Sequence, residues 1–286
     1  MKLSGLNTLV TGGSQGLGRH IVEAFLAEGA NVVFCARTSA DVAWTQSALA
    51  PQLKPGQQLH GLTCDISDPA GVAALFARAA QLGPLQAVVN NAGIYGPIGP
   101  TEDIPLADWM QAWQVNVTGT LLVCQHAVRA MRPRGAGKII NISGGGATNP
   151  MPRFAAYAAT KAAVVRLTET LAEEYRADHI DVNAVAPGAL RTRLTAQVLA
   201  AGPAKAGADF YARNKKWSDE GAADPRLAAG LCVWLASAES DGITGKLVSA
   251  QWDPWKDPAK FRAQATGDVY TLRRIVPEDR AKKPAP

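Results

Sequence analysis

Two residues with complementary chemistry, Tyr157 and Lys161, stand four positions apart where the pattern predicts a helix over 155–177. Residues at this spacing share one face of a helix, so the lysine ammonium is expected beside the tyrosine phenol. A free phenol titrates near pH ~10, and a neighbouring cation favours the phenolate and lowers that pKa. The pair is therefore suited to exchanging a proton with an alcohol or a carbonyl oxygen near neutral pH.

A glycine-rich turn, TGGSQGLG at 11–18, precedes this pair in the chain. It follows an apolar strand expected over 7–11 and opens an amphipathic helix expected over 17–28. Glycines there allow a tight turn and let a pyrophosphate approach the backbone amides of a helix N-terminus. The strand–turn–helix context predicts dinucleotide binding. Because a Tyr and a Lys at this spacing occur on many helices by chance, it is the glycine turn that makes a catalytic role for the Tyr157–Lys161 pair a specific expectation.

The end of the second expected strand, over 31–36, bears on which dinucleotide binds. Sites for NAD often place a carboxylate there to bind the ribose 2′-hydroxyl. This chain instead has Arg37 and Thr38. Arg37 is suited to a 2′-phosphate, with Thr38 or Ser14 donating a hydrogen bond, which favours NADP(H) over NAD(H). The alternative is that Arg37 points to solvent or stacks on the adenine of NAD.

Apolar strands alternate with helices along most of the chain. Further strands are expected over 58–64, 85–90, 138–142, 180–186 and 246–250, and further helices over 41–49, 69–81, 106–131 and 225–236. The helix over 106–131 is expected to be interrupted near Asn116. Continuous apolar strands indicate a parallel sheet covered on both faces, and right-handed crossovers make it doubly wound. The sequence thus predicts an α/β Rossmann fold, with a seven-stranded, mainly parallel sheet and a single nucleotide-binding and catalytic domain over 1–250.

Two segments fall outside this alternation. Residues 189–223 form a long connection at the carboxyl end of a strand, where lids over ligands often form. Residues 94–97 are expected to line the same pocket. The tail, 251–286, has too few apolar residues to be a separate domain but could dock on the body or on a neighbouring subunit. Trp252 and Trp255 could plug the pocket, cross to a neighbour or anchor the chain.

Composition excludes several classes of function. The chain has 286 residues, and no apolar run approaches the roughly 18 residues that cross a bilayer. We see no secretory signal, and the four cysteines are widely spaced, so we expect a reducing cytoplasm without disulfides or zinc. The four histidines lack metal-ligand spacing, so no metal is expected. The net charge of +5 comes largely from basic stretches at 205–216 and 262–283, which are either solvated surface or attractive to anionic ligands. No motif indicates nucleic-acid binding.

Taken together, these motifs resemble the short-chain dehydrogenase/reductase family, in its compact single-domain branch, over about residues 4–250. Cys64-Asp65-Ile66 is similar to the segment whose Asp contacts the adenine, and Asn90-Asn91-Ala92-Gly93 to the motif beside the cofactor. Pro187-Gly188 with Thr192 is similar to the stretch that contacts the nicotinamide amide. The resemblance implies cofactor contacts from Gly12, Ser14, Gln15, Gly16, Leu17, Gly18, Arg37, Thr38, Asp65, Ile66, Asn91, Ala92, Gly93, Tyr157, Lys161, Pro187, Gly188 and Thr192.

The resemblance also implies a mechanism. Tyr157 is expected to act as general acid in reduction and general base in oxidation. Lys161 is expected to lower the Tyr157 pKa and to hold the nicotinamide ribose. Asn116 is expected to hold a water that passes protons to Lys161.

One position departs from the family pattern. The family serine that holds the substrate oxygen lies thirteen residues before the tyrosine, where this chain has Gly144. Ser143 is one residue earlier, and the three following glycines allow a bulge that would bring it into the site. The alternative is that Ser143 faces away and a backbone amide or a water polarises the substrate.

The sequence therefore predicts an NAD(P)-dependent oxidoreductase that interconverts a secondary alcohol and a ketone, with NADP(H) favoured. One alternative is an NAD-dependent catabolic dehydrogenase of the same family, and another is a non-enzymatic dinucleotide sensor. In relatives the helix that carries the tyrosine packs across a two-fold axis, so a homotetramer or homodimer is expected. The outer face of that helix includes Ala163, Leu167 and Leu171.

Overall fold

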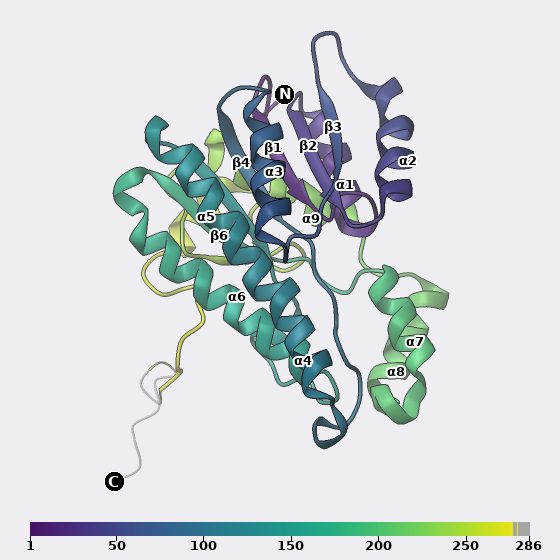
Figure 1. Ribbon diagram of the computed structural model, residues 1–286. Coiled ribbons are helices and arrows are strands. Elements are labelled where there is room, and N and C mark those ends of the chain that lie inside the picture. Colours follow the sequence, from purple (N-terminus) through teal and green to yellow (C-terminus); the bar gives the residue numbers. More distant parts are fainter. Residues whose placement is uncertain (277–278, 280–286) are drawn as a thin grey trace.

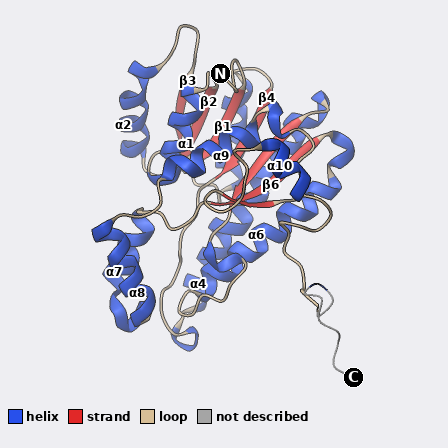
Figure 2. Ribbon diagram, turned by 180° about the vertical axis from the view of Figure 1, so that it is seen from behind, coloured by secondary structure: helices blue, strands red, loops and turns tan. Residues whose placement is uncertain are grey.

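In the computed structural model, which describes residues 1–276 and 279, seven parallel strands form one sheet (Figures 1 and 2). The strands are β1 (Asn7–Thr11), β2 (Asn31–Ala36), β3 (Leu59–Thr63), β4 (Leu85–Asn90), β5 (Gly137–Ile142), β6 (Ile180–Ala186) and β7 (Leu247–Ser249). Their order is β3-β2-β1-β4-β5-β6-β7, and every adjacent pair is parallel. This confirms the doubly wound sheet, and the order reverses between β1 and β4, where such folds bind ligands.

Helices cover both faces of the sheet because neighbouring strand residues point to opposite sides. Val10 of β1 packs in one apolar cluster with α1 (Gly16–Ala27) and α9 (Pro225–Ala236). Leu9 packs in the other cluster, with α3 (Pro69–Ala80), α5 (Gly119–Met131) and α6 (Ala155–Glu174). The remaining helices are α2 (Ser39–Leu49), α4 (Leu106–Trp113), α7 (Arg193–Ala206), α8 (Ala208–Glu220) and α10 (Pro258–Gln264).

Two helical segments differ from the sequence-based expectation. The helix predicted over 155–177 ends at Glu174, and His179 follows with a left-handed φ of 53° before β6. The connection predicted over 189–223 is largely helical, because α7 and α8 pack antiparallel to each other on one side of the sheet's carboxyl end (Figure 1). The predicted interruption near Asn116 is confirmed as a π-helical turn over Gln114–Thr118.

The described part of the tail docks on the body of the same chain. Phe261 of α10 is fully buried, edge-on to Trp234 of α9 at 5.3 Å and stacked on Tyr270 at 5.1 Å. The Trp255 indole is also buried and donates to the Ala250 carbonyl at 2.9 Å. Trp255 therefore anchors the chain, whereas Trp252 is 84% exposed. No helix among the described residues has the length and apolar character needed to span a bilayer.

Candidate active site

The glycine turn packs against the segment that follows β4. The Asn91 side-chain amide donates to the carbonyls of Thr11 and Gly12 at 3.0 and 3.1 Å, and the Thr11 hydroxyl accepts from the amides of Asn91 and Ala92 at 3.1 Å each. A Cβ added at Gly18 would overlap the Gly12 carbonyl, so the first turn of α1 can approach the loop only with glycine there. The turn is thus held close to the sheet by two neighbouring strands.

The residues around this turn fit a dinucleotide. The Gln15 side chain does not cap α1, so the first amides of the helix lack a side-chain partner. The Ser14 hydroxyl is buried without a hydrogen-bond partner in the described structure. Uncapped amides at a helix N-terminus favour an anion such as a pyrophosphate. They face a cavity of about 1240 Å³ that reaches from the glycine turn to Tyr157 and into α7 and α8.

Most of the predicted site residues line this one cavity. They are Gly12, Gln15, Gly16, Leu17, Gly18, Arg37, Asp65, Ile66, Asn91, Ala92, Gly93, Ser143, Tyr157, Lys161, Pro187, Gly188 and Thr192. Ser14, Thr38 and Asn116 do not line it. Ser14 is buried beneath the turn, Thr38 is exposed at the start of α2, and Asn116 is buried behind the segment after β4.

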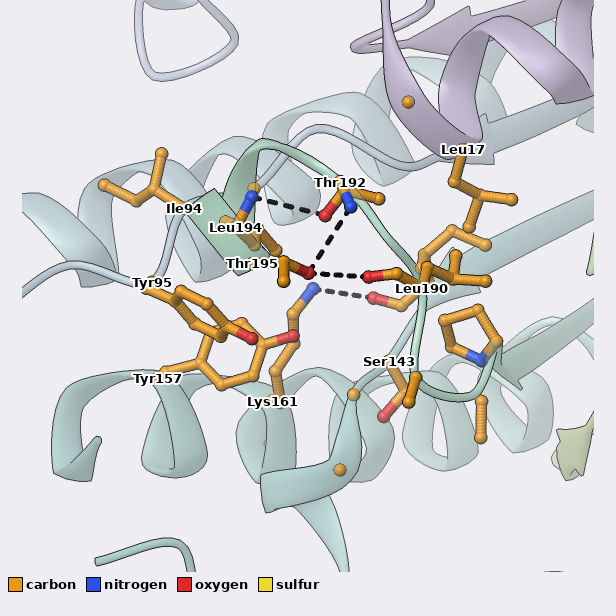
Figure 3. Close-up of a pocket in the computed structure, with 18 of the residues that line it drawn as sticks. Leu17, Ile94, Tyr95, Ser143, Tyr157, Lys161, Leu190, Thr192, Leu194 and Thr195 are labelled. Atoms are coloured by element: carbon orange, nitrogen blue, oxygen red, sulfur yellow. Dashed lines mark hydrogen bonds between the residues drawn. The ribbon is translucent and has the colours of Figure 1, made fainter. Parts of the chain in front are cut away.

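Tyr157 and Lys161 lie together in the cavity, as predicted, but their ionisation differs from the prediction. The Lys161 ammonium donates to the Ile142 carbonyl at 2.8 Å and lies 5.7 Å from the centroid of the Tyr157 ring (Figure 3). Burial raises the pKa of Tyr157 well above its ordinary value, with a smaller contribution from Tyr95. Burial also lowers the Lys161 pKa to about 8. The expected lowering of the phenol pKa is therefore not found, because loss of hydration outweighs an ammonium that is engaged elsewhere.

Asn116 positions a loop rather than facing the cavity. Its side-chain oxygen accepts from the Ile94 amide at 2.9 Å, and its amide donates to the Ile94 carbonyl at 2.9 Å and to the Thr160 hydroxyl at 3.0 Å. A Cβ added at Gly93 would lie 3.2 Å from the Asn116 side-chain oxygen and 3.5 Å from the Lys161 nitrogen, so the two residues are close. The expected role of Asn116 in holding a water stays a prediction.

The two residues at the serine position point in different directions. Gly144 is extended, with a φ of −168°, and a Cβ added there would overlap the Tyr157 hydroxyl and lie 2.9 Å from the carbon that bears it. Neighbouring residues of an extended backbone point to opposite sides, so the Ser143 side chain lies away from that hydroxyl (Figure 3). The Ser143 hydroxyl is buried without a described partner. The expected bulge is absent, and this geometry agrees with the alternative in which Ser143 faces away.

Aromatic side chains pack together at the end of the cavity that holds Tyr157, where Tyr95 and Phe210 line it and Phe154 is buried behind them. The Tyr95 ring packs edge-on against the rings of Tyr157 and Phe154, with centroids 4.6 and 5.2 Å apart. Phe154 packs edge-on against Phe210 of α8, with ring centroids 4.8 Å apart. Arg153 and Arg213 also line the cavity. The sequence placed residues 94–97 at the pocket, but it gave no sign that Tyr95 packs on Tyr157. That contact joins the segment after β4 to α6, and no local pattern encodes it.

Known proteins share both the sequence and the fold. Residues 7–202 match the family model described as short chain dehydrogenase. The chain is 36% identical over 245 residues to 3beta-hydroxysteroid dehydrogenase 1 of Eggerthella lenta, covering 85% of this chain and 91% of that protein. The crystal structure of levodione reductase matches with a TM-score of 0.79 and 26% identity, covering 86% of this chain and 96% of that one.

A further solved structure holds a cofactor. Gluconate 5-dehydrogenase from Burkholderia cenocepacia, in complex with NADP and tartrate, matches with a TM-score of 0.75 and 28% identity, covering 87% of this chain and 94% of that one. The family model, these relatives and the shared fold together show that the chain belongs to the short-chain dehydrogenase/reductase family and is an NAD(P)-dependent oxidoreductase acting on CH–OH groups.

Proposed function

We propose that this protein interconverts a secondary alcohol and a ketone with NADP(H), and that Tyr157 is the general acid and base. The observation that carries the proposal is that Tyr157 and Lys161 line the same cavity as the uncapped start of α1. A cofactor held at the glycine turn can extend along that cavity toward the phenol. When bound, the nicotinamide supplies or accepts the hydride.

The chain's own residues hold the two reactants and move the proton. In reduction, the Tyr157 hydroxyl gives its proton to the carbonyl oxygen as that oxygen gains negative charge. In oxidation, the Tyr157 phenolate takes the proton of the alcohol. Lys161, whose ammonium donates to the Ile142 carbonyl at 2.8 Å, lines the cavity and would hold the nicotinamide ribose. An ammonium in that position stabilises the phenolate.

Arg37 supports the preference for NADP(H). Its side chain lines the cavity at the end of β2 and is exposed, and it has no ion pair within residues 1–276 and 279. Asp41 is the only carboxylate in the first turn of α2. A guanidinium without a carboxylate partner is well suited to bind a 2′-phosphate. The gluconate 5-dehydrogenase neighbour, whose structure contains NADP, agrees with this proposal.

The cofactor preference is tested by titration calorimetry with NADPH and NADH. We expect NADPH to bind the wild-type protein at least tenfold more tightly, because each charge-assisted hydrogen bond to the phosphate contributes about 1.5–3 kcal/mol. Arg37→Asp should shift the preference toward NADH, since a carboxylate repels the phosphate and can accept from the ribose hydroxyl. An NADPH-to-NADH affinity ratio that Arg37→Asp leaves unchanged would refute this role of Arg37.

The catalytic role is tested with the substrates that relatives' names suggest: a 3β-hydroxysteroid, gluconate and levodione, each with both cofactors. Tyr157→Phe should reduce kcat by about 10²–10⁴-fold, the usual contribution of a positioned acid or base. Tyr175→Phe, which removes a phenol at the far end of α6, is the control. Equal rates for Tyr157→Phe and wild type would contradict the mechanism. NADPH binding without turnover of any compound would favour the dinucleotide sensor.

A further inference from the structure

The cavity lacks a hydroxyl where the family mechanism needs one. Gly144 occupies the position of the family serine, and the Tyr157 ring fills the space beside it, with its hydroxyl-bearing carbon 2.9 Å from an added Cβ. A serine side chain has no room there in this arrangement. The Ser143 hydroxyl is buried and lies on the other side of the backbone. The reacting oxygen therefore needs a second hydrogen-bond donor from elsewhere.

Tyr95 is the hydroxyl-bearing side chain that packs on Tyr157. The two ring centroids are 4.6 Å apart with planes at 77°, and both rings direct their hydroxyls toward the middle of the cavity (Figure 3). Tyr95 lines the cavity and is half-buried. Its hydroxyl has no hydrogen-bond partner among residues 1–276 and 279. It is thus free to donate to a ligand at the Tyr157 hydroxyl.

The protein holds Tyr95 in place from both sides. The preceding residue, Ile94, exchanges two hydrogen bonds of 2.9 Å with the buried Asn116 side chain. The following residue, Gly96, has a φ of 69°, and a Cβ there would lie 2.7 Å from the Ala112 methyl. Phe154 packs edge-on against the ring at 5.2 Å. Donors positioned before the reaction cost no reorganisation when charge develops on the oxygen.

We propose that Tyr95 donates a hydrogen bond to the reacting oxygen of the substrate, the part that the serine plays in relatives. Tyr157 transfers the proton, and the Tyr95 proton stays on its own oxygen throughout. Burial raises the Tyr95 pKa to about 12, so the phenol remains a donor across the pH range of an assay. This inference rests on the proposed function, because it assigns a partner to Tyr157 in that reaction.

The test compares Tyr95→Phe with Tyr95→Leu, using whichever of the 3β-hydroxysteroid, gluconate and levodione the wild type turns over fastest. Tyr95→Phe keeps the ring and loses the hydroxyl, so we expect kcat to fall about 100–1000-fold, as for loss of an oxyanion donor, with little change in KM. NADPH affinity should stay within twofold of wild type, which shows that the cofactor site is intact. The isotope effect on the transferred hydride should rise, because hydride transfer becomes slower. It is measured with NADPH deuterated at the transferred position when levodione is reduced, and with the alcohol deuterated at its carbinol carbon when the 3β-hydroxysteroid or gluconate is oxidised.

Two outcomes would overturn the inference. If Tyr95→Phe keeps kcat within threefold of wild type while Tyr95→Leu has a much lower kcat, the ring of Tyr95 contributes only packing and its hydroxyl has no catalytic role. If both variants keep kcat, Tyr95 has neither role. Failure of the proposed function is seen separately, as full activity of Tyr157→Phe or as no turnover by the wild type.

Discussion

At the scale of single residues, burial sets the ionisation of Tyr157 and Lys161, the pair proposed to be catalytic. Lys161 is 6% exposed, and its pKa is lowered to about 8 because the ammonium loses its hydration. In the unfolded chain the same lysine titrates near its ordinary value of 10.5. Below pH 8 both states are protonated, so the folded protein bears the full cost of the buried charge. Between pH 8 and 10.5 the unfolded state holds the extra proton, so this cost falls as the pH rises.

Lys161→Met should therefore stabilise the protein at pH 7 while reducing activity. The lowering of the Lys161 pKa corresponds to a destabilisation of about 3 kcal/mol, which the methionine removes. The methionine also loses the hydrogen bond to the Ile142 carbonyl, which costs about 1 kcal/mol of stability. The net gain of about 2 kcal/mol corresponds to a Tm roughly 4 °C higher. Thermal unfolding from pH 7 to 10 measures it, and the Tm advantage should shrink as the pH rises.

Lys138→Met is the matched control. Lys138 is also buried, but its ammonium lies 2.7 Å from carboxylate oxygens of both Asp181 and Asp241. Its loss leaves a carboxylate without its partner, so the Tm should fall. A Tm difference for Lys161→Met that does not change with pH would count against the buried charge as its cause.

The candidate site also shows what residue types alone can and cannot predict. Tyr157, Lys161 and the glycine turn were found because their spacing is fixed by one helix and one turn. The direction in which the Ser143 side chain points could not be predicted, because it depends on whether the backbone at Gly144 stays extended or bulges. Three glycines allow both conformations, and the choice is made by the packing of α6 against that loop.

At the scale of elements, the strands of the sheet were predictable, but the helical structure of the connection over 189–223 was not. β2, β4 and β6 have the predicted bounds because each is a mainly apolar segment ended by glycine, proline or polar residues. Helices α7 and α8 are broken by Gly202, Pro203 and Gly207, and α8 is polar on most of its surface. The one local signal was the capping box of Thr192 and Thr195 at the start of α7.

Helices α7 and α8 owe their position to packing, and the contact of Phe210 with Phe154 tests this. Phe210 joins α8 to the buried Phe154, which precedes α6, at 4.8 Å between ring centroids. We expect Phe210→Ala to raise amide hydrogen exchange over 193–220 by about tenfold, since losing an aromatic pair and its buried area costs more than 1 kcal/mol. Exchange in the sheet should not change.

Lys216→Ala is the control on the same helix. Lys216 is exposed, and its 3.7 Å ion pair with Glu220 is on the surface, so exchange should stay as in wild type. If Phe210→Ala left exchange over 193–220 unchanged, α7 and α8 would be held in place by other contacts.

At the scale of the whole molecule, the tail completes the core beneath α9. The sequence left open whether residues 251–286 dock on the body or on a neighbour, because a short amphipathic segment does not specify its partner. The described residues dock on their own chain. The Lys246 ammonium donates to the carbonyls of Gly267 and Val269 at 2.7 and 3.0 Å, and Phe261 lies in the same cluster as Val10 of the central strand.

The tail should therefore contribute to the global stability of the fold rather than to a local contact. Phe261 is fully buried against Trp234 and Tyr270, so Phe261→Ala should lower the free energy of unfolding by about 3–5 kcal/mol, measured in urea. Trp252→Ala, at an 84% exposed tryptophan of the same segment, should change it by less than about 0.5 kcal/mol. If Phe261→Ala lowered the free energy of unfolding as little as Trp252→Ala is expected to, α10 would not contribute to the stability of the fold. A single cooperative transition with a lower midpoint for Phe261→Ala would show that the tail and the sheet unfold together.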